Sequence, residues 1–132
     1  MMAEVKGYIS QVIGPVVDVH FEFDSTKESS KLPSIHDALK VRRPDGRDLI
    51  IEVHQHLGEV TVRCVAMDST DGLRRGLEAV CTGAPIVMPV GSQIRGRVLN
   101  VTGNTIDGLD KLNMDTTLPI HREAPKFEEL TT

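Results

Sequence analysis

The most constraining stretch of this chain is Val17–Phe23, in which apolar and polar residues alternate without a fault. Successive side chains of a β-strand point to opposite faces, so this alternation predicts a strand with one buried face and one solvated face. No stretch before Thr82 shows a convincing helical period. Turn residues separate several further strand-like stretches, and this pattern predicts an all-β fold, either a small sandwich or a closed barrel. The other expected strands are Val5–Ile13, a strand containing Leu39 and Val41, Asp48–His56, Val60–Met67 and a short one at Leu77–Cys81.

Glycine, proline and polar clusters mark where these strands should bend or end. Gly7 interrupts the first strand and favours a bulge or tight bend there. The pair Gly14-Pro15 ends that strand, and Asp45-Gly46 supplies the positive φ angles of a hairpin turn. The serine-rich segment Asp24–Lys31 (DSTKESSK) is typical of a solvated loop.

The composition of the sequence changes after Thr82, where glycine and proline divide the chain into pieces too short to make a core. Ser92–Asn100 is expected to form one or two helical turns, with Ser92 as the N-cap. The last segment, Pro119–Thr132, is predicted to be an extended connecting segment. We therefore expect this half to open a second domain and to pack poorly on the strands that precede it.

Composition excludes several classes of protein. Aromatic residues make up only 3% of the 132 residues, so the core must be aliphatic. The net charge is −4 and the sequence pI about 5.7, which argues against a basic face for nucleic acid. Cys64 and Cys81 are too few for a disulfide framework and are expected to be buried free thiols in a reducing compartment. With no apolar run of membrane-spanning length and no signal peptide, a soluble, cytoplasmic chain is expected.

The segment Ala66–Gly76 (AMDSTDGLRRG) combines carboxylates, hydroxyls and paired arginines. Asp68, Ser69, Thr70 and Asp71 offer magnesium ligands, and Arg74 and Arg75 offer phosphate contacts. The simpler interpretation is a structural turn, because Asp and Ser side chains cap nearby backbone amides and Gly72 supplies a positive φ. A phosphate cradle needs a glycine-rich loop leading into a helix, whereas here the glycine leads back into a strand. We therefore predict a turn.

The sequence also offers residues for two other kinds of site, a metal site and a cysteine nucleophile. His54 and His56 lie two apart on a strand and should share a face, but a tight metal site needs three or four ligands. His20, His36 and His121 lie in other segments with no clustering pattern. Cys64 has mostly apolar neighbours, which favours a core residue over a nucleophile. No glycine is followed by lysine, so the chain has no GxxxxGK[ST] phosphate-binding loop.

With these residues placed, the chain closely resembles the N-terminal part of the catalytic beta subunit of the F-type ATP synthase. Seven matching runs follow the family's order over nearly the whole chain, and together they are highly specific. Departures are few: the Asp24–Lys31 loop is longer than usual, and Cys64 and Cys81 replace other small residues. The runs are QVIGPVVDV (11–19), LPSIHDAL (32–39), EVHQHLGE (52–59), VRCVAMDSTDGLRRG (62–76), TGAPIVMPVG (82–91), GRVLNVTGNTID (96–107) and PIHREAPKFEEL (119–130).

The resemblance implies a six-stranded β-barrel over residues 1–82, followed at 83–132 by an incomplete lead-in to an α/β nucleotide-binding domain. It also implies that the phosphate-binding loop, the catalytic glutamate and the adenine pocket follow beyond this stretch. Accordingly, no catalytic, cofactor-binding or metal residue is assigned here, and no cofactor is expected in this part. The parent enzyme uses ATP and ADP with magnesium and makes ATP as proton flow turns a central stalk. These 132 residues alone are not expected to catalyse.

The partners implied by the resemblance are ATP synthase alpha subunits, which alternate with beta subunits in a hexameric ring, and the rest of the soluble head. The expected location is the cytoplasmic side of the inner membrane, peripheral and reached only through the complex. Self-association of the chain is left open. Two alternatives remain open. One is a free-standing small-barrel module for an oligonucleotide or metabolite, and the other is a metal enzyme using His54 and His56.

Overall fold

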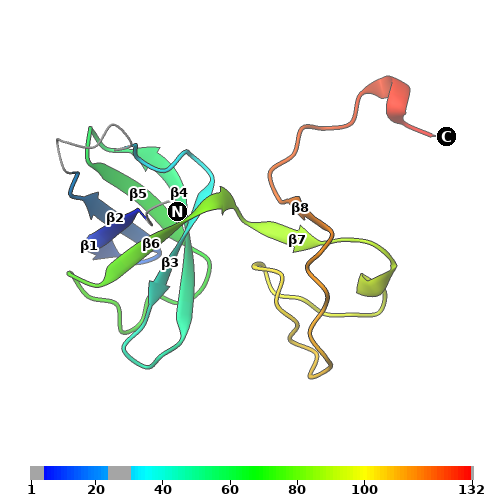
Figure 1. Ribbon diagram of the computed structural model, residues 1–132, viewed down its shortest axis with the longest axis horizontal. Coiled ribbons are helices and arrows are strands. Elements are labelled where there is room, and N and C mark those ends of the chain that lie inside the picture. Colours follow the sequence, from blue (N-terminus) through cyan, green and yellow to red (C-terminus); the bar gives the residue numbers. More distant parts are fainter. Residues whose placement is uncertain (1–4, 24–30, 132) are drawn as a thin grey trace.

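The computed structural model describes residues 5–23 and 31–131, and its main body is a closed six-stranded barrel (Figure 1). The strands close in the order β1-β2-β5-β4-β3-β6, with every neighbouring pair antiparallel. The expected all-β fold is confirmed as a barrel rather than a sandwich, and no α-helix occurs in the described ranges. The barrel strands are β1 (Lys6–Ile13), β2 (Val16–Phe21), β3 (Asp37–Arg42), β4 (Asp48–His56), β5 (Thr61–Ala66) and β6 (Glu78–Pro85).

The barrel interior is filled by aliphatic side chains, as the low aromatic content requires. In β2 the predicted face is buried at Val17, Val19 and Phe21, and Phe23 stacks on Phe21 with ring centroids 5.9 Å apart. Asp18, assigned to the solvated face by alternation, is nevertheless buried, because it forms an ion pair with an arginine of β5. The twelve residues of the core are Ile9, Val17, Val19, Phe21, Leu39, Val41, Leu49, Ile51, Val53, Val62, Cys64 and Ala79.

The bulge expected in β1 is present, but three residues beyond Gly7. Ile9 pairs with Val19 and Gln11 with Asp18, which leaves Ser10 as the extra residue. Gly7 serves another purpose: a Cβ atom there would lie 2.6 Å from Val19 Cγ1 and 2.9 Å from a ring carbon of Phe21. The missing side chain therefore lets β1 approach the core side chains of β2 closely.

The turn predicted at Asp45-Gly46 joins β3 to β4. Gly46 has φ 87°, and its amide donates to the Arg43 carbonyl at 2.9 Å, while the Arg47 amide donates to the Asp45 carboxylate. This confirms the hairpin. The loop predicted at Asp24–Lys31 lies outside the described residues, except for Lys31, which is exposed.

The last barrel strand is longer than expected and leads directly into the second part of the chain. β6 continues to Pro85, beyond the short strand predicted at Leu77–Cys81, and β7 (Val87–Pro89) follows after one residue. β7 pairs with β8 (Thr117–Pro119), so this part is built around a two-stranded sheet beside the barrel (Figure 1).

The helix expected over Ser92–Asn100 was wrong in extent and in its cap. Only a 3₁₀ turn, η1 (Ser92–Ile94), forms; its N-cap is Gly91 and no side chain caps it. The chain then turns at Gly96, which has φ 71°, and Leu99 pairs with Thr105 in an isolated bridge. A glycine in the left-handed region ends a helix readily, which explains why the segment does not continue as one. The expected extended end is interrupted by a second 3₁₀ turn, η2 (Phe127–Glu129).

The second part of the chain leaves much apolar surface in solvent. Ile86 is buried, but of the fourteen exposed large apolar side chains in the described part of the chain, nine lie beyond residue 97, and Phe127 is 89% exposed. The others are Val98, Val101, Ile106, Leu109, Met114, Leu118, Ile120 and Leu130. This agrees with the expectation that residues after Thr82 pack poorly on the barrel. Among the described residues, no helix is long and apolar enough to cross a membrane.

Candidate functional site

The side chains of Asp68, Ser69 and Thr70 are hydrogen-bonded in a turn between β5 and β6. Asp68 Oδ1 accepts from the Ser69 amide at 2.7 Å, and Ser69 Oγ accepts from the Asp71 amide at 3.1 Å. Gly72 has φ 82°, as the turn prediction required. Side-chain oxygens that cap local amides in this way are the signature of Asx and Ser/Thr turns.

Two further bonds fasten this turn to the barrel. Thr70 Oγ1 donates to the Gly14 carbonyl of the β1–β2 turn at 2.7 Å. Arg43, at the end of β3, is buried, and its Nη1 donates to the Asp71 carbonyl at 3.2 Å. The sequence did not single out Arg43, because nothing in the local pattern indicates that a hairpin arginine reaches 28 residues along the chain. The turn thus acts as a connector between three loops at one end of the barrel.

Arg74 and Arg75 border an open depression of about 530 Å³ next to Ser10, Gln11 and Val12 of β1. They are exposed, and they lie beside a strand edge rather than beside a helix N-terminus with free amides. The geometry of a phosphate cradle is therefore not assembled around them.

The two cysteines are free thiols, as predicted. Cys64 is buried in the core, and burial raises its pKa to about 12. Cys81, partly exposed on β6, has its pKa raised to about 11, also mainly by burial. Neither thiol is activated as a nucleophile, since activation requires a lowered pKa.

The His54/His56 pair does not form the core of a metal site. A bulge in β4 makes His54 the extra residue between Val53 and Gln55, which breaks the strict alternation behind the prediction. His56 Nε2 lies 2.8 Å from the Pro33 carbonyl, and both histidines are exposed. In the described ranges, neither belongs to a group of three potential metal ligands.

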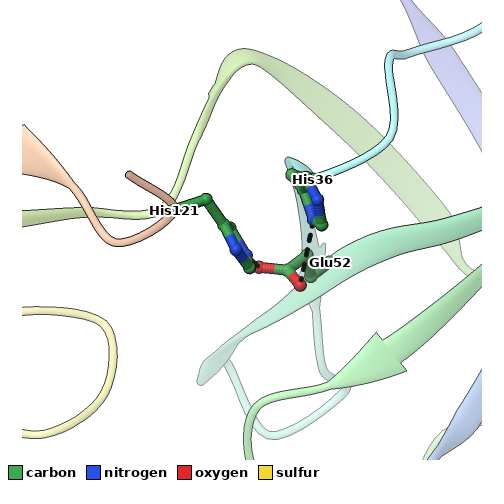
Figure 2. Close-up of side chains that lie close together, drawn as sticks. All are labelled: His36, Glu52 and His121. Carbon is green, nitrogen blue, oxygen red and sulfur yellow. Dashed lines mark hydrogen bonds and ion pairs between the residues drawn. The ribbon is translucent and has the colours of Figure 1, made fainter. Parts of the chain in front are cut away.

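Three other residues do come together, and the sequence pattern did not indicate it. Figure 2 shows the imidazoles of His36 and His121 side by side above the carboxylate of Glu52. His121 Nε2 lies 2.9 Å from Glu52 Oε2, and His36 Nδ1 lies 3.8 Å from Glu52 Oε1. The rings stack with centroids 3.8 Å apart and an angle of 23°. This cluster, His36–Glu52–His121, joins the barrel to the segment after β8.

Local structure explains how the barrel half of this cluster is held. Glu52 lies in mid-β4, paired with Ala38 of β3, and its side chain is only 13% exposed. His36 closes the turn before β3 with φ 78°, a conformation that non-glycine residues adopt rarely. Its amide donates to the Val53 carbonyl at 2.8 Å, which places its ring beside Glu52. Without the strand register, the sequence offers no signal that residues 36, 52 and 121 meet.

The aromatic side chains are poorly placed for stacking on bases. Phe21 belongs to the core and Phe23 stacks against it, which leaves Tyr8 and Phe127 as the exposed rings, one on the barrel and one near residue 130. Single-strand binding barrels use several adjacent aromatic rings in a basic groove.

One comparison with known proteins bears on the identity of this barrel. The family model for the ATP synthase alpha/beta family, beta-barrel domain, matches residues 9–83, more than half of the chain. The matched residues include β2, β3, β4 and β5 completely and most of β1 and β6.

Proposed function

The chain belongs to the ATP synthase alpha/beta family, and from this premise we propose that it is the N-terminal barrel part of a catalytic beta subunit. Its own task is assembly: the barrel packs laterally between alpha subunits in an alternating hexameric ring. The parent complex makes ATP from ADP and phosphate, driven by a proton gradient. The beta assignment is supported by the seven matching runs, from QVIGPVVDV at 11–19 to PIHREAPKFEEL at 119–130.

The observation that carries the assembly role is the filled interior of the matched barrel. Twelve apolar side chains occupy it, so the barrel interacts with other molecules through its outer surface and its loops. A filled interior leaves no room for a ligand inside the barrel.

The outer face of β3 and β6 is the best candidate for a lateral contact. A depression of about 900 Å³ lies over it, lined by apolar residues such as Leu77 and Val80 and by charged ones that include Arg42 and Glu78. Protein interfaces combine apolar and charged residues in this way.

We propose further that this part of the enzyme holds no magnesium nucleotide. Asp68, Ser69, Thr70 and Asp71 are the magnesium ligands that the sequence offers. Side-chain oxygens of the first three are used in hydrogen bonds to the Ser69 amide, the Asp71 amide and the Gly14 carbonyl, respectively. These residues do not fit the group, so the nucleotide chemistry is assigned to parts of the parent that carry a phosphate-binding loop. In the parent complex the chain would lie on the cytoplasmic side of the inner membrane, peripheral to it.

The assembly proposal is tested by mixing the 132-residue chain with purified ATP synthase alpha subunits, and separately with beta subunits, and measuring mass by light scattering after gel filtration. Association with alpha and none with beta is expected. Arg42→Glu should weaken the complex, and Arg95→Glu, an equal charge change at an exposed site outside the barrel, should not. Association with neither subunit, or equally with both, would overturn the assignment.

The alternative of a barrel module for an oligonucleotide is not favoured by any feature of the described residues. The exposed aromatic rings are far apart in the chain, and the net charge of −4 opposes a polyanion.

A further inference from the structure

Three potential metal ligands from widely separated parts of the chain meet beside β4. His36 precedes β3, Glu52 lies within β4, and His121 follows β8 by two residues. One ligand atom of each residue lies within 4.8 Å of the corresponding atoms of the other two. We propose that His36, Glu52 and His121 bind one divalent transition metal ion of the zinc type, which clasps the segment after β8 to the barrel.

The donor set matches the chemistry of zinc. Two imidazole nitrogens and one carboxylate oxygen, with water in the fourth position, form one of the standard three-ligand tetrahedral sets. With metal–ligand distances of about 2.0–2.2 Å, tetrahedral ligand atoms lie about 3.4 Å apart. The separations are 2.9 Å from Glu52 Oε2 to His121 Nε2 and 3.8 Å from Glu52 Oε1 to His36 Nδ1, and one ligand atom of each of the three residues lies within 4.8 Å of the other two. Small side-chain movements therefore suffice to bring all three donors to one ion.

The three side chains differ in solvent exposure as such a site needs. Glu52 is fixed in a central strand, with a side chain only 13% exposed, whereas the histidine side chains are 41% and 47% exposed. The rings can therefore rotate out of their parallel stack until both nitrogens point at a common centre. Figure 2 shows both rings already on the same side of the carboxylate.

The charges at the cluster also favour a cation. In the described ranges, the ion pairs of Glu52 are with these two imidazoles, and no lysine or arginine contacts its carboxylate. A neutral imidazole is both the ligand form and the common form near pH 7. A divalent ion would give the carboxylate a full counter-charge.

The site should discriminate between metals by ligand type. Nitrogen donors suit zinc, copper and nickel, whereas magnesium prefers oxygen ligands in an octahedron. Zinc is therefore expected to bind in the presence of excess magnesium, which separates this site from any magnesium nucleotide of the parent enzyme.

The experiment titrates Zn²⁺ into the 132-residue chain by calorimetry in buffer containing millimolar magnesium. One equivalent is expected to bind. His121→Ala and Glu52→Gln should each weaken binding by about tenfold or more, because loss of a ligand costs at least as much as loss of the partner that orients one. The double variant of His54→Ala with His56→Ala, and Cys81→Ser, are matched controls that remove exposed or partly exposed donors elsewhere and should bind as tightly as the wild type.

Two direct readouts accompany the affinities. In NMR spectra, zinc should shift the ring signals of His36 and His121 and leave those of His54 and His56 unchanged. Zinc should also slow tryptic cleavage after Arg122, because the bound metal ion holds the adjacent His121 against the barrel. This protection should vanish in Glu52→Gln. Absence of one-to-one binding in the wild type, or binding lost in the His54/His56 double variant and kept in His121→Ala, would overturn the proposal.

Discussion

Asp18 and Arg63 lie directly opposite each other on β2 and β5 and form a pair of parallel charge-assisted hydrogen bonds. Arg63 Nε donates to Asp18 Oδ1 at 2.9 Å, and Nη2 donates to Oδ2 at 3.0 Å. The burial of the two side chains is unequal: that of Asp18 is 6% exposed and that of Arg63 38%. The Asp18 carboxylate therefore depends on Arg63 for its counter-charge, whereas the Arg63 guanidinium is also solvated by water.

This asymmetry predicts that Arg63→Met destabilises the barrel more than Asp18→Asn does. The first change leaves a buried carboxylate without its counter-charge, and the second leaves an arginine that water can solvate. Thermal denaturation should show a loss of several degrees in Tm for Arg63→Met and a smaller loss for Asp18→Asn. Glu78→Gln, which breaks the exposed Lys6–Glu78 pair, is the control and should change stability by no more than about 0.5 kcal/mol. The reverse ranking would contradict this account.

Much of the barrel could be predicted from the sequence because its determinants are local. The period-two pattern at Val17–Phe23 and the Asp45-Gly46 turn each specify backbone geometry over a few residues. The structure confirms the turn and a strand at this place, but the strand runs over Val16–Phe21 and ends before Phe23. The alternation did not predict the burial of Asp18, because that burial depends on Arg63, 45 residues away. The helix expected after Ser92 failed for a related reason: the N-cap preference of Ser92 indicated it, but Gly96 and the Leu99–Thr105 bridge direct the chain elsewhere.

The candidate sites also differ in whether they could be predicted from the sequence. The turn at Asp68–Gly72 was predictable, since its bonds are formed within a few residues. The cluster of His36, Glu52 and His121 was not, because it requires the register of β3 on β4 and the return of the chain after β8. Residues separated by 69 positions carry no periodic signal that relates them.

Gly7→Ala is expected to destabilise the barrel by overpacking. The new methyl would lie 2.6 Å from Val19 Cγ1, inside the core, and overpacked cores lose about 1–3 kcal/mol. Urea unfolding of Gly7→Ala, Val19→Ala and the double variant measures the coupling between the two sites. Because Val19→Ala removes the clashing methyl, the double variant should lose less than the sum of the single losses. Additive losses would show that the contact is not what Gly7 avoids.

The two thiols should differ in reactivity and should remain poorly reactive near neutral pH. With a pKa of about 11, Cys81 is thiolate in only about one molecule in ten thousand at pH 7, and Cys64, with a pKa of about 12, is also buried. Iodoacetamide labelling followed by mass spectrometry should modify Cys81 first and Cys64 only on unfolding. The Cys81→Ser chain serves as the control for Cys64 alone. Rapid labelling of Cys64 in the folded chain would contradict its placement in the core.

The same burial has a consequence for stability in alkali. Because folding raises both thiol pKa values above their ordinary 9.0, the folded state favours the protonated thiol. This contribution is fully present below pH 9 and is lost progressively as the pH rises towards 11 and 12. Cys64→Ala should flatten the fall in stability over this range, measured by urea unfolding at several pH values, although its stability at pH 7 will be lower. An unchanged slope would count against the buried thiol as the cause.

Asp107 is expected to organise the loop between η1 and β8 in a pH-dependent way. Its carboxylate accepts bonds from Arg97 and from the amides of Val98 and Leu109, and the bond from Arg97 above all holds its pKa well below the ordinary 3.8. A lowered pKa stabilises the folded loop above pH 3.8, and this stabilisation is lost as the pH falls through the lower folded value. Amide exchange at Val98 and Leu109 should therefore quicken at neutral pH in Asp107→Asn, with barrel amides unchanged. Slow exchange at both amides in the variant would refute the role of Asp107 in organising this loop.

The last prediction concerns nucleotide. Calorimetric titration of the chain with ATP and magnesium to millimolar concentration is expected to show no saturable heat, because tight phosphate binding needs converging backbone amides and a positioned lysine. Arg74 and Arg75 are exposed beside β1, and long-range attraction from two such charges is screened at 0.15 M salt. Weak heat that disappears with added salt would therefore agree with the prediction. Saturable binding that survives 0.15 M salt and is lost when Arg74→Ala and Arg75→Ala are combined would contradict it, since the turn would then hold phosphate through side chains alone.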